Sequence, residues 1–261
     1  QYTSWLEQNN EERLFEVMYS NHFGHIFVND AITRVPLIDP TSTISFNSLN
    51  RVYRHHRGAH LYRLAKEDLL KYGMVSCNEV RTHDEIACDL ANATHTEYKE
   101  VMTANFPLYI DGDWSVNNAA NQYNAEIYGN TLMTFVTETI FLDDVAFITE
   151  KIFKPMMMGH PVILLASAGT LAALREMGFS TNWCGIDPSY NDIIDNRERF
   201  EATHNALVDW INLPKVEKTK RIVESMPTIE HNFMLLRTRD FYKEAIIEAL
   251  NRSAEYFNEK P

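Results

Sequence analysis

Three arginines spaced three residues apart are the strongest chemical feature of the sequence. Arg51, Arg54 and Arg57 directly follow Asn50, where a predicted strand leads into a predicted helix. Guanidinium groups bind phosphate oxygens in pairs, and a helix N-terminus adds free N–H groups, so this spacing predicts a clamp for a pyrophosphate. The alternative is a solvated basic face, because residues 41–81 contain seven basic residues and only three acidic ones.

A second cluster opens the helix predicted at 149–159. Thr149 has a side chain suited to a helix N-cap, and Glu150 and Lys151 then occupy the first turn. A carboxylate at Glu150 is suited to accept hydrogen bonds from ribose hydroxyls, and Lys151 and Lys154 are suited to neutralise phosphate. A plain capped helix with surface charges explains the same residues, so both interpretations stay open.

Three carboxylates are candidates for chemistry. Glu138 ends the apolar segment 132–138, where a buried charge needs either a catalytic or substrate-binding role or a salt-bridge partner. Asp113 forms an Asp-Gly-Asp sequence with Asp111, and Asp30 follows a short apolar run. The two aspartates at 111 and 113 have the spacing of a manganese-binding pair, but Asp-Gly-Asp is also ordinary turn chemistry. We favour the turn and expect no metal.

Charge and composition narrow the classes of function. The 261-residue chain has 24 basic and 36 acidic residues and a net charge of −12, which argues against binding nucleic acid by charge alone. No apolar run approaches the roughly 18 residues that span a bilayer, so we expect no membrane span. The three cysteines are odd in number and widely spaced, which fits a reducing compartment better than a disulfide framework.

Strands and helices alternate along the chain, after an N-terminal helix at 4–20 and a strand at 25–30. The apolar runs predict strands at 43–50, 74–80, 132–138 and 161–167. The helical patterns cover 57–72, 83–104, 149–159, 168–178, 196–211, 214–225 and 233–256, and 105–130 is a loop-dominated insertion. This alternation predicts an α/β fold with a doubly wound parallel sheet and flanking helices. Ligands of such sheets bind beyond the carboxyl ends of the strands, where the clusters above begin.

Three segments resemble the donor-binding half of a GT-B type glycosyltransferase, which is a Rossmann-like domain. They are FNSLNRVYRHHRGAHLYRL (46–64), FVTETIFLDDVAFITEKIFKPMMMGHPVILL (135–165) and IEHNF (229–233). The likeness is to the α1,3-fucosyltransferase and exostosin-like group and to short glycosyltransferases of viruses and phages.

The resemblance implies roles for individual residues. Arg57 looks like the diphosphate-binding arginine of that group, with Arg54 next, Glu150 like the glutamate that holds the ribose, and Lys151 like the phosphate-binding lysine. Glu138 matches the glutamate of a Phe-Glu-Asn-Ser segment, although this chain has Val-Thr-Glu-Thr-Ile there.

The resemblance also implies a division of the chain. Residues 1–42 would be a reduced acceptor part, 43–240 the nucleotide-sugar-binding domain and 241–261 a C-terminal helix. The implied reaction transfers a sugar from a UDP- or GDP-sugar to a hydroxyl of a glycan acceptor, with inversion and without a metal or other cofactor. Glu138, Asp113 and Asp30 are then the candidate general bases. The expected location is the cytoplasm, or the host cytoplasm for a viral protein.

Three other functions stay open. The first is a viral enzyme that glycosylates a 5-hydroxymethylated pyrimidine in DNA, which the likeness to phage proteins suggests and the acidic charge opposes. The second is a nonenzymatic nucleotide- or glycan-binding module, which the short N-terminal region suggests. The third is a GT-A type enzyme that uses Asp111 and Asp113 with manganese.

Overall fold

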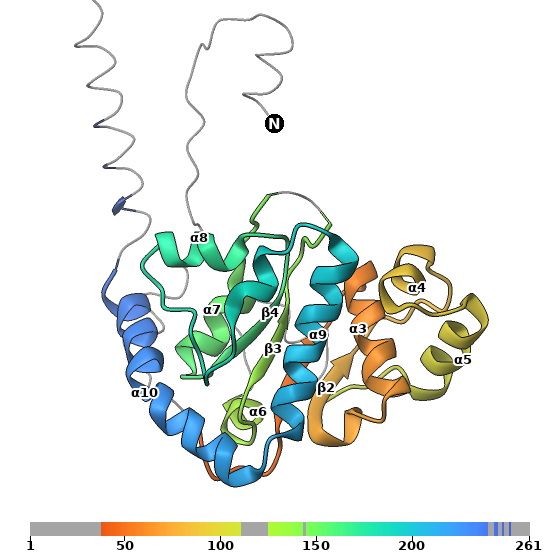
Figure 1. Cartoon of the computed structure of the whole chain (residues 1–261), viewed down its shortest axis with the longest axis horizontal. Helices are drawn as coiled ribbons and strands as arrows, with labels where there is room; N and C mark the ends of the chain where they lie inside the picture. Colours follow the sequence, from red (N-terminus) through yellow and green to blue (C-terminus); the bar gives the residue numbers. More distant parts are fainter. Residues whose placement is uncertain are drawn as a thin grey trace, which may run out of the picture.

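A parallel β-sheet forms the centre of the protein (Figure 1). The structure is a computed structural model that describes residues 38–110, 125–142 and 145–239, together with 243, 244, 247 and 251. The strands are β1 (Phe46–Asn50), β2 (Gly73–Cys77), β3 (Thr134–Thr137) and β4 (Val162–Leu165). They form a four-stranded sheet of order β2-β1-β3-β4, in which every pairing is parallel. The predicted α/β fold with a parallel sheet is confirmed.

Helices connect the strands. The chain contains α3 (His55–Lys66), the 3₁₀ turn η1 (Leu70–Tyr72), α4 (Glu85–Ala91), α5 (His95–Asn105), α6 (Ala125–Gly129), α7 (Glu150–Met157), α8 (Thr170–Glu176), the 3₁₀ turn η2 (Pro188–Asp192), α9 (Asn196–Asn212) and α10 (Lys215–Thr238). From β1 the chain passes through α3 to β2. It then returns to the other side of β1 as β3 and continues through α7 to β4. The winding direction therefore reverses between β1 and β3, and such a switch point is where open parallel sheets bind ligands.

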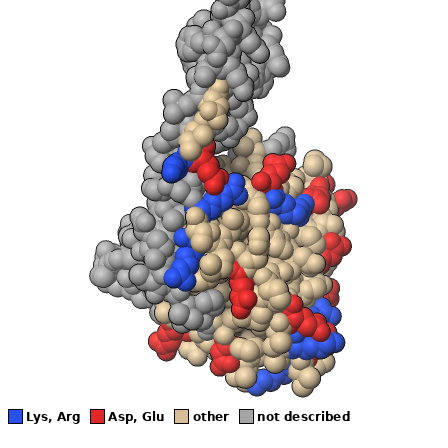
Figure 2. All heavy atoms as spheres, turned by 90° about the vertical axis from the view of Figure 1, so that its left-hand side faces the viewer, with Lys and Arg blue, Asp and Glu red and all other residues tan. Residues whose placement is uncertain are grey.

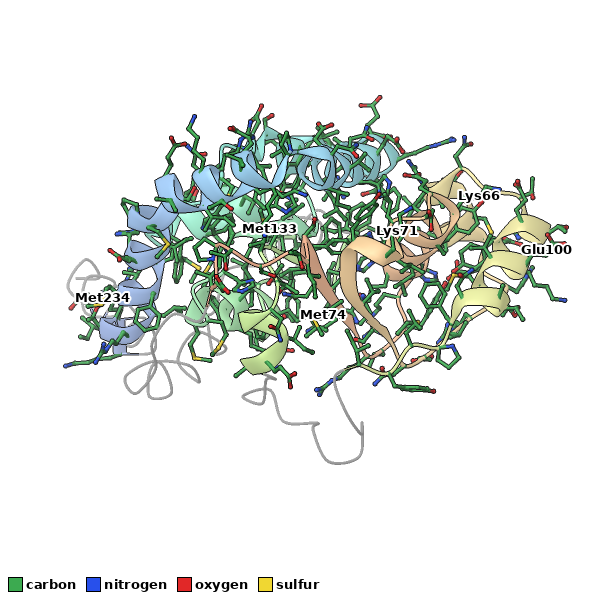
Figure 3. The ribbon with its side chains drawn as sticks, turned by 90° about the horizontal axis from the view of Figure 1, so that it is seen from below. Lys66, Lys71, Met74, Glu100, Met133 and Met234 are labelled. Atoms are coloured by element: carbon green, nitrogen blue, oxygen red, sulfur yellow. The ribbon has the colours of Figure 1, made fainter. Side chains whose placement is uncertain are left out.

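Helices cover both faces of the sheet. Seen from below, α9 runs along one side of the sheet and α6 and α7 lie on the other, while Met133 lies in the interior (Figure 3). α3 shares the face of α9, because Arg63 Nη1 lies 2.6 Å from a carboxylate oxygen of Glu201 and His204 Nε2 lies 2.9 Å from Glu67. α10 packs against α7. The arrangement is that of a doubly wound, Rossmann-like sheet.

The central strand β1 buries polar side chains, whereas β4 is apolar. β4 is entirely apolar and buried, as expected for a strand covered on both faces. β1 instead buries Asn47, Ser48 and Asn50. Asn47 Nδ2 donates to Thr134 Oγ1 of β3 at 3.2 Å and to Thr131 Oγ1, just before β3, at 2.7 Å, so this amide nitrogen ties β1 to the neighbouring segment.

Three predictions of helices differ from the structure. The helix predicted at 57–72 ends at Lys66, and residues 70–72 form the 3₁₀ turn η1. The helix predicted at 83–104 is two helices, because Asn92 adopts a left-handed conformation (φ 52°) and Thr94 starts α5 with a capping box to Glu97. The helices predicted at 214–225 and 233–256 are joined in α10, which runs through Pro227 as far as Thr238.

Other predicted segments are only partly described. The loop-dominated 105–130 region contains α6 at its end. The elements predicted at 4–20 and 25–30 lie outside the described residues, as does most of 241–261. Over the described part of the chain, every helix is too short or too polar to cross a bilayer.

Gly58 lets two tyrosines approach the middle of α3. A Cβ at this position would overlap the hydroxyl groups of Tyr53 and Tyr98. Gly→Ala in a helix ordinarily stabilises by about 1 kcal/mol, but overpacking costs about 1–3 kcal/mol. We therefore expect Gly58→Ala to lower the free energy of unfolding in a urea titration. An unchanged or raised stability would contradict this packing.

Acid should destabilise the fold through buried histidines. His160 lies beside β4, where Nε2 donates to the carbonyl of Tyr128, and burial lowers its pKa from 6.5 to about 4. Between pH 6.5 and 4, His160 therefore binds a proton in the unfolded chain but stays neutral in the folded chain. The free energy of unfolding should fall as the pH drops through this range, by about 3 kcal/mol for this residue. Urea titrations from pH 7.5 to 4.5 should show a shallower decline for His160→Gln than for wild type. The exposed His231→Gln should keep the wild-type slope, and equal slopes in all three proteins would contradict the assignment.

Candidate functional site

The carboxyl ends of β1 and β3 are tied together by Asn50. Its Oδ1 accepts a hydrogen bond from Thr137 Oγ1 at 2.7 Å, and its backbone N–H donates to Ser76 Oγ of β2 at 3.1 Å. The side chain is buried. Asn50 therefore joins three neighbouring strands at the edge where the winding reverses.

Arg57 carries a positive charge into the same edge. Its Nη1 donates to the carbonyl of Val52 at 2.7 Å, and Nη2 donates to the carbonyls of Thr137 at 3.0 Å and Glu138 at 3.2 Å. Burial, followed by the charge of Arg54, lowers the pKa of Arg57 to about 10, while Glu138 and Glu150 oppose that shift. The guanidinium thus stays charged at neutral pH, and it braces the loop after β1 against the end of β3.

Glu138 is a buried carboxylate that joins β3 to the start of α7. It accepts hydrogen bonds from the Thr149 amide at 3.0 Å, from Thr149 Oγ1 at 2.7 Å and from the Thr139 amide at 3.0 Å. Burial raises its pKa, although Lys151 and the bonds from Thr149 and Thr139 oppose this. With no exposed surface, Glu138 is placed to position the α7 N-terminus.

The first turn of α7 brings opposite charges together at its N-terminus. Thr149 caps the helix by accepting from the Lys151 amide. Lys151 Nζ lies 3.1 Å from both Thr139 Oγ1 and Thr149 Oγ1 and 2.9 Å from Glu150 Oε1. Burial opposes ionisation of Glu150, but Lys151 outweighs it and lowers the pKa of that carboxyl. Lys151 is about one-third exposed and faces the end of β3.

The structure brings six of the predicted residues to one place. Glu138 links the two connections at the switch point, because its carbonyl accepts from Arg57 of α3 and its carboxylate accepts from Thr149 at the start of α7. The residues gathered there are Asn50, Arg57, Glu138, Thr149, Glu150 and Lys151. Arg54 lies at the N-cap of α3, exposed, with Nη1 bonded to the Tyr53 carbonyl at 3.0 Å. Arg51 directly follows β1 and Lys154 lies in α7, and both are partly exposed.

Asp30, Asp111 and Asp113 lie outside the described residues. Among the residues that are described, no three His, Cys, Asp or Glu side chains gather as metal ligands would.

The rest of the basic segment 41–81 behaves as a solvated face. Its members pair with acids as Arg63–Glu201, Lys66–Glu97, Lys71–Asp68 and Arg81–Glu79. Charges of both signs are likewise interspersed on the side of the molecule shown in Figure 2. The interpretation as a solvated face therefore applies to these four residues, whereas the first arginines of the segment lie at the switch point.

Sequence reasoning missed His56 as part of this site. Its Nε2 donates to the Glu138 carbonyl at 2.8 Å, and its ring stacks on Phe141 at 5.3 Å. Burial and then the charge of Arg57 lower its pKa to about 3, so the ring is neutral. The partner is 82 residues away, so the only sequence signal was its position next to Arg57.

The chain was compared with protein-family models, curated proteins and solved structures, and none of them matches it.

The bond between Glu138 and Thr149 should be measurable as a coupling energy. Glu138→Gln and Thr149→Val each leave a buried partner without its hydrogen bond, at about 1–3 kcal/mol, and the double variant removes both ends. We expect urea unfolding to give a coupling of at least 1 kcal/mol. Thr170→Val, which removes the bond from Thr170 to the Ser167 carbonyl at the start of α8, should combine additively with Glu138→Gln. Additivity in both pairs would contradict the hydrogen bond between Glu138 and Thr149.

Proposed function

We propose that the chain is a glycosyltransferase that uses a nucleotide sugar, and that its described domain is a GT-B type donor domain. The nucleoside diphosphate of a UDP- or GDP-sugar would bind at the switch point between β1 and β3. The observation that carries this proposal is the hydrogen-bonded link through Glu138: its carbonyl accepts from Arg57 Nη2, and its carboxylate accepts from Thr149, the N-cap of α7. This link joins an arginine-rich helix start to a Thr-Glu-Lys helix start at the switch point.

The diphosphate would lie between Arg54 and the N-terminus of α7. Arg54 is exposed, and Lys151 is partly exposed beside the amides that begin the helix. Cationic side chains bind phosphate oxygens through charge-assisted hydrogen bonds, whereas the Thr149 and Lys151 amides at the helix start already donate to Glu138 and to Thr149 Oγ1. Arg57, whose guanidinium is bonded to three carbonyls, would act through its charge and would position the loop.

The ribose would lie against Glu150. Its carboxylate keeps an ion pair with Lys151 and is partly exposed, so one side chain links the phosphate-binding and ribose-binding regions. This pairing favours ionised Glu150, which is the form that accepts hydrogen bonds from hydroxyls.

The proposed reaction breaks the bond between the anomeric carbon and the diphosphate. Negative charge grows on the leaving diphosphate, and fixed positive groups stabilise that charge in the transition state. Arg54, Arg57 and Lys151 would supply them, with Arg51 and Lys154 alongside. An acceptor hydroxyl would attack the opposite face of the anomeric carbon, which inverts its configuration. Asp30 and Asp113 stay candidate bases, while Glu138 is assigned to positioning.

Two observations would distinguish this proposal from its alternatives: which acceptor receives the sugar, and whether any hydrolysis or transfer occurs. Transfer to a glycan would support it, whereas transfer to 5-hydroxymethylated DNA would favour the viral DNA enzyme. Binding of a nucleotide sugar without hydrolysis or transfer would favour a nonenzymatic module.

Lys151→Ala and Arg54→Ala should each weaken binding of UDP or GDP at least tenfold, because each removes a charge-assisted bond to phosphate worth about 1.5–3 kcal/mol. Isothermal titration calorimetry measures the dissociation constants, and circular dichroism confirms the fold. Lys66→Ala removes a lysine at the far end of α3, where it pairs with Glu97, and should bind like wild type. Absence of nucleotide binding by wild type, or wild-type affinity in both site variants, would overturn the proposed function.

A further inference from the structure

A second polar cluster lies at the same edge of the sheet, on the β2 side of β1. His55 Nδ1 lies 2.7 Å from Asp84 Oδ2. The His55 side chain is 42% exposed, whereas that of Asp84 is 5% exposed. A buried carboxylate therefore holds a histidine whose ring reaches the surface.

Asp84 is fixed by bonds from several directions. Its Oδ1 accepts from the Ala87 amide at 3.0 Å, which caps α4, and Oδ2 accepts from Tyr53 Oη at 2.5 Å. Tyr98 Oη lies 3.0 Å from Tyr53 Oη. Burial raises the pKa of Asp84, but the bonds from Tyr53, the Ala87 amide and His55 outweigh it, so its pKa is lowered and the carboxylate is ionised.

The ionised carboxylate decides the form of the His55 ring. A carboxylate only accepts hydrogen bonds, so Nδ1 must carry the proton that it shares with Asp84. The other nitrogen, Nε2, then holds a lone pair, and it has no hydrogen-bond partner among the residues that the structure describes. A carboxylate that fixes this tautomer and stabilises the imidazolium is the arrangement of a general base.

The cluster lies close to the proposed donor site. His55 is the first residue of α3, and Asp84 is the N-cap of α4, so each follows the carboxyl end of a strand. β1 pairs with both β2 and β3, so those flanking strand ends are two strand spacings apart, roughly 10 Å. The next residue, His56, bonds to Glu138 at the end of β3. A substrate that extends from the diphosphate site across β1 would reach His55.

We propose that His55 is the general base for the acceptor hydroxyl, with Asp84 as its positioning residue; this rests on the proposed glycosyl transfer. The acceptor oxygen forms a bond to the anomeric carbon while the bond from that carbon to the diphosphate oxygen breaks, and the electron pair leaves with the diphosphate. The hydroxyl proton passes to Nε2 of His55. The imidazolium, stabilised by Asp84, then returns the proton to water.

The first test uses water as the acceptor, so no acceptor needs to be identified. Release of nucleoside diphosphate is measured for UDP-glucose, UDP-N-acetylglucosamine, GDP-mannose and GDP-fucose, and donor dissociation constants are measured by calorimetry. His55→Gln should lower kcat at least 100-fold and leave donor affinity within twofold of wild type. His83→Gln changes an exposed histidine in the neighbouring loop and should match wild type.

The second test separates positioning from structural support. Asp84→Asn keeps an oxygen for the Ala87 amide but cannot hold the same His55 tautomer, so kcat should fall at least tenfold while donor affinity stays within twofold of wild type. Nitrogen-15 NMR should show the Nδ1–H tautomer of His55 in wild type and its loss in Asp84→Asn.

The outcomes distinguish the two proposals. Failure of wild type to bind any of the four donors would overturn the proposed function. If wild type binds and hydrolyses a donor and His55→Gln keeps the wild-type kcat, His55 is not the general base. An Nε2–H tautomer of His55 in wild type would overturn that role too. Either result would leave the proposed donor site unaffected.

Discussion

Arg57 brings a full positive charge into the interior, and the geometry of the switch point depends on how that charge is accommodated. An unpaired buried cation is very costly, so its guanidinium must be surrounded by acceptors. The carbonyls of Val52, Thr137 and Glu138 provide them, and the charges of Glu138 and Glu150 offset part of the burial penalty. Because these acceptors belong to the loop after β1 and to the end of β3, a single side chain fixes the spacing between the two central connections.

Burial divides the site residues into two groups. Asn50, Arg57, Glu138 and Thr149 are buried and bonded to other parts of the protein, so they set positions and electrostatic potential. The side chains with accessible surface are those with the chemistry to contact a ligand: exposed Arg54, one-third-exposed Lys151 and half-exposed His55. A buried framework that holds exposed functional groups is what preorganised binding of a charged leaving group requires, because the groups need little rearrangement when the charge develops.

The sequence predicted what local patterns determine. Apolar runs located the strands, and Thr149 was correctly placed as a helix cap, because both features depend on neighbouring residues. The break at Asn92 was missed, since a single left-handed residue leaves helical periodicity on both sides intact. Continuity of α10 through Pro227 was missed because packing overrides the local preference of proline. Pairs such as His56–Glu138 and His55–Asp84 could not be predicted, because strand order, which spacing does not reveal, brings them together.

The first turn of α3 gains its importance from the place of β1 in the sheet. β1 lies between β2 and β3, so the helix that follows it begins between the two neighbouring connections. Successive helical residues point about 100° apart, and the turn uses this to reach both sides. His55 bonds to Asp84 after β2, whereas His56 and Arg57 bond to Glu138 at the end of β3. Three consecutive side chains thus connect the proposed general base on one side of β1 with the proposed phosphate-binding region on the other. Any displacement of this turn would move both together, so the helix itself sets the spacing between the proposed base and the proposed leaving group.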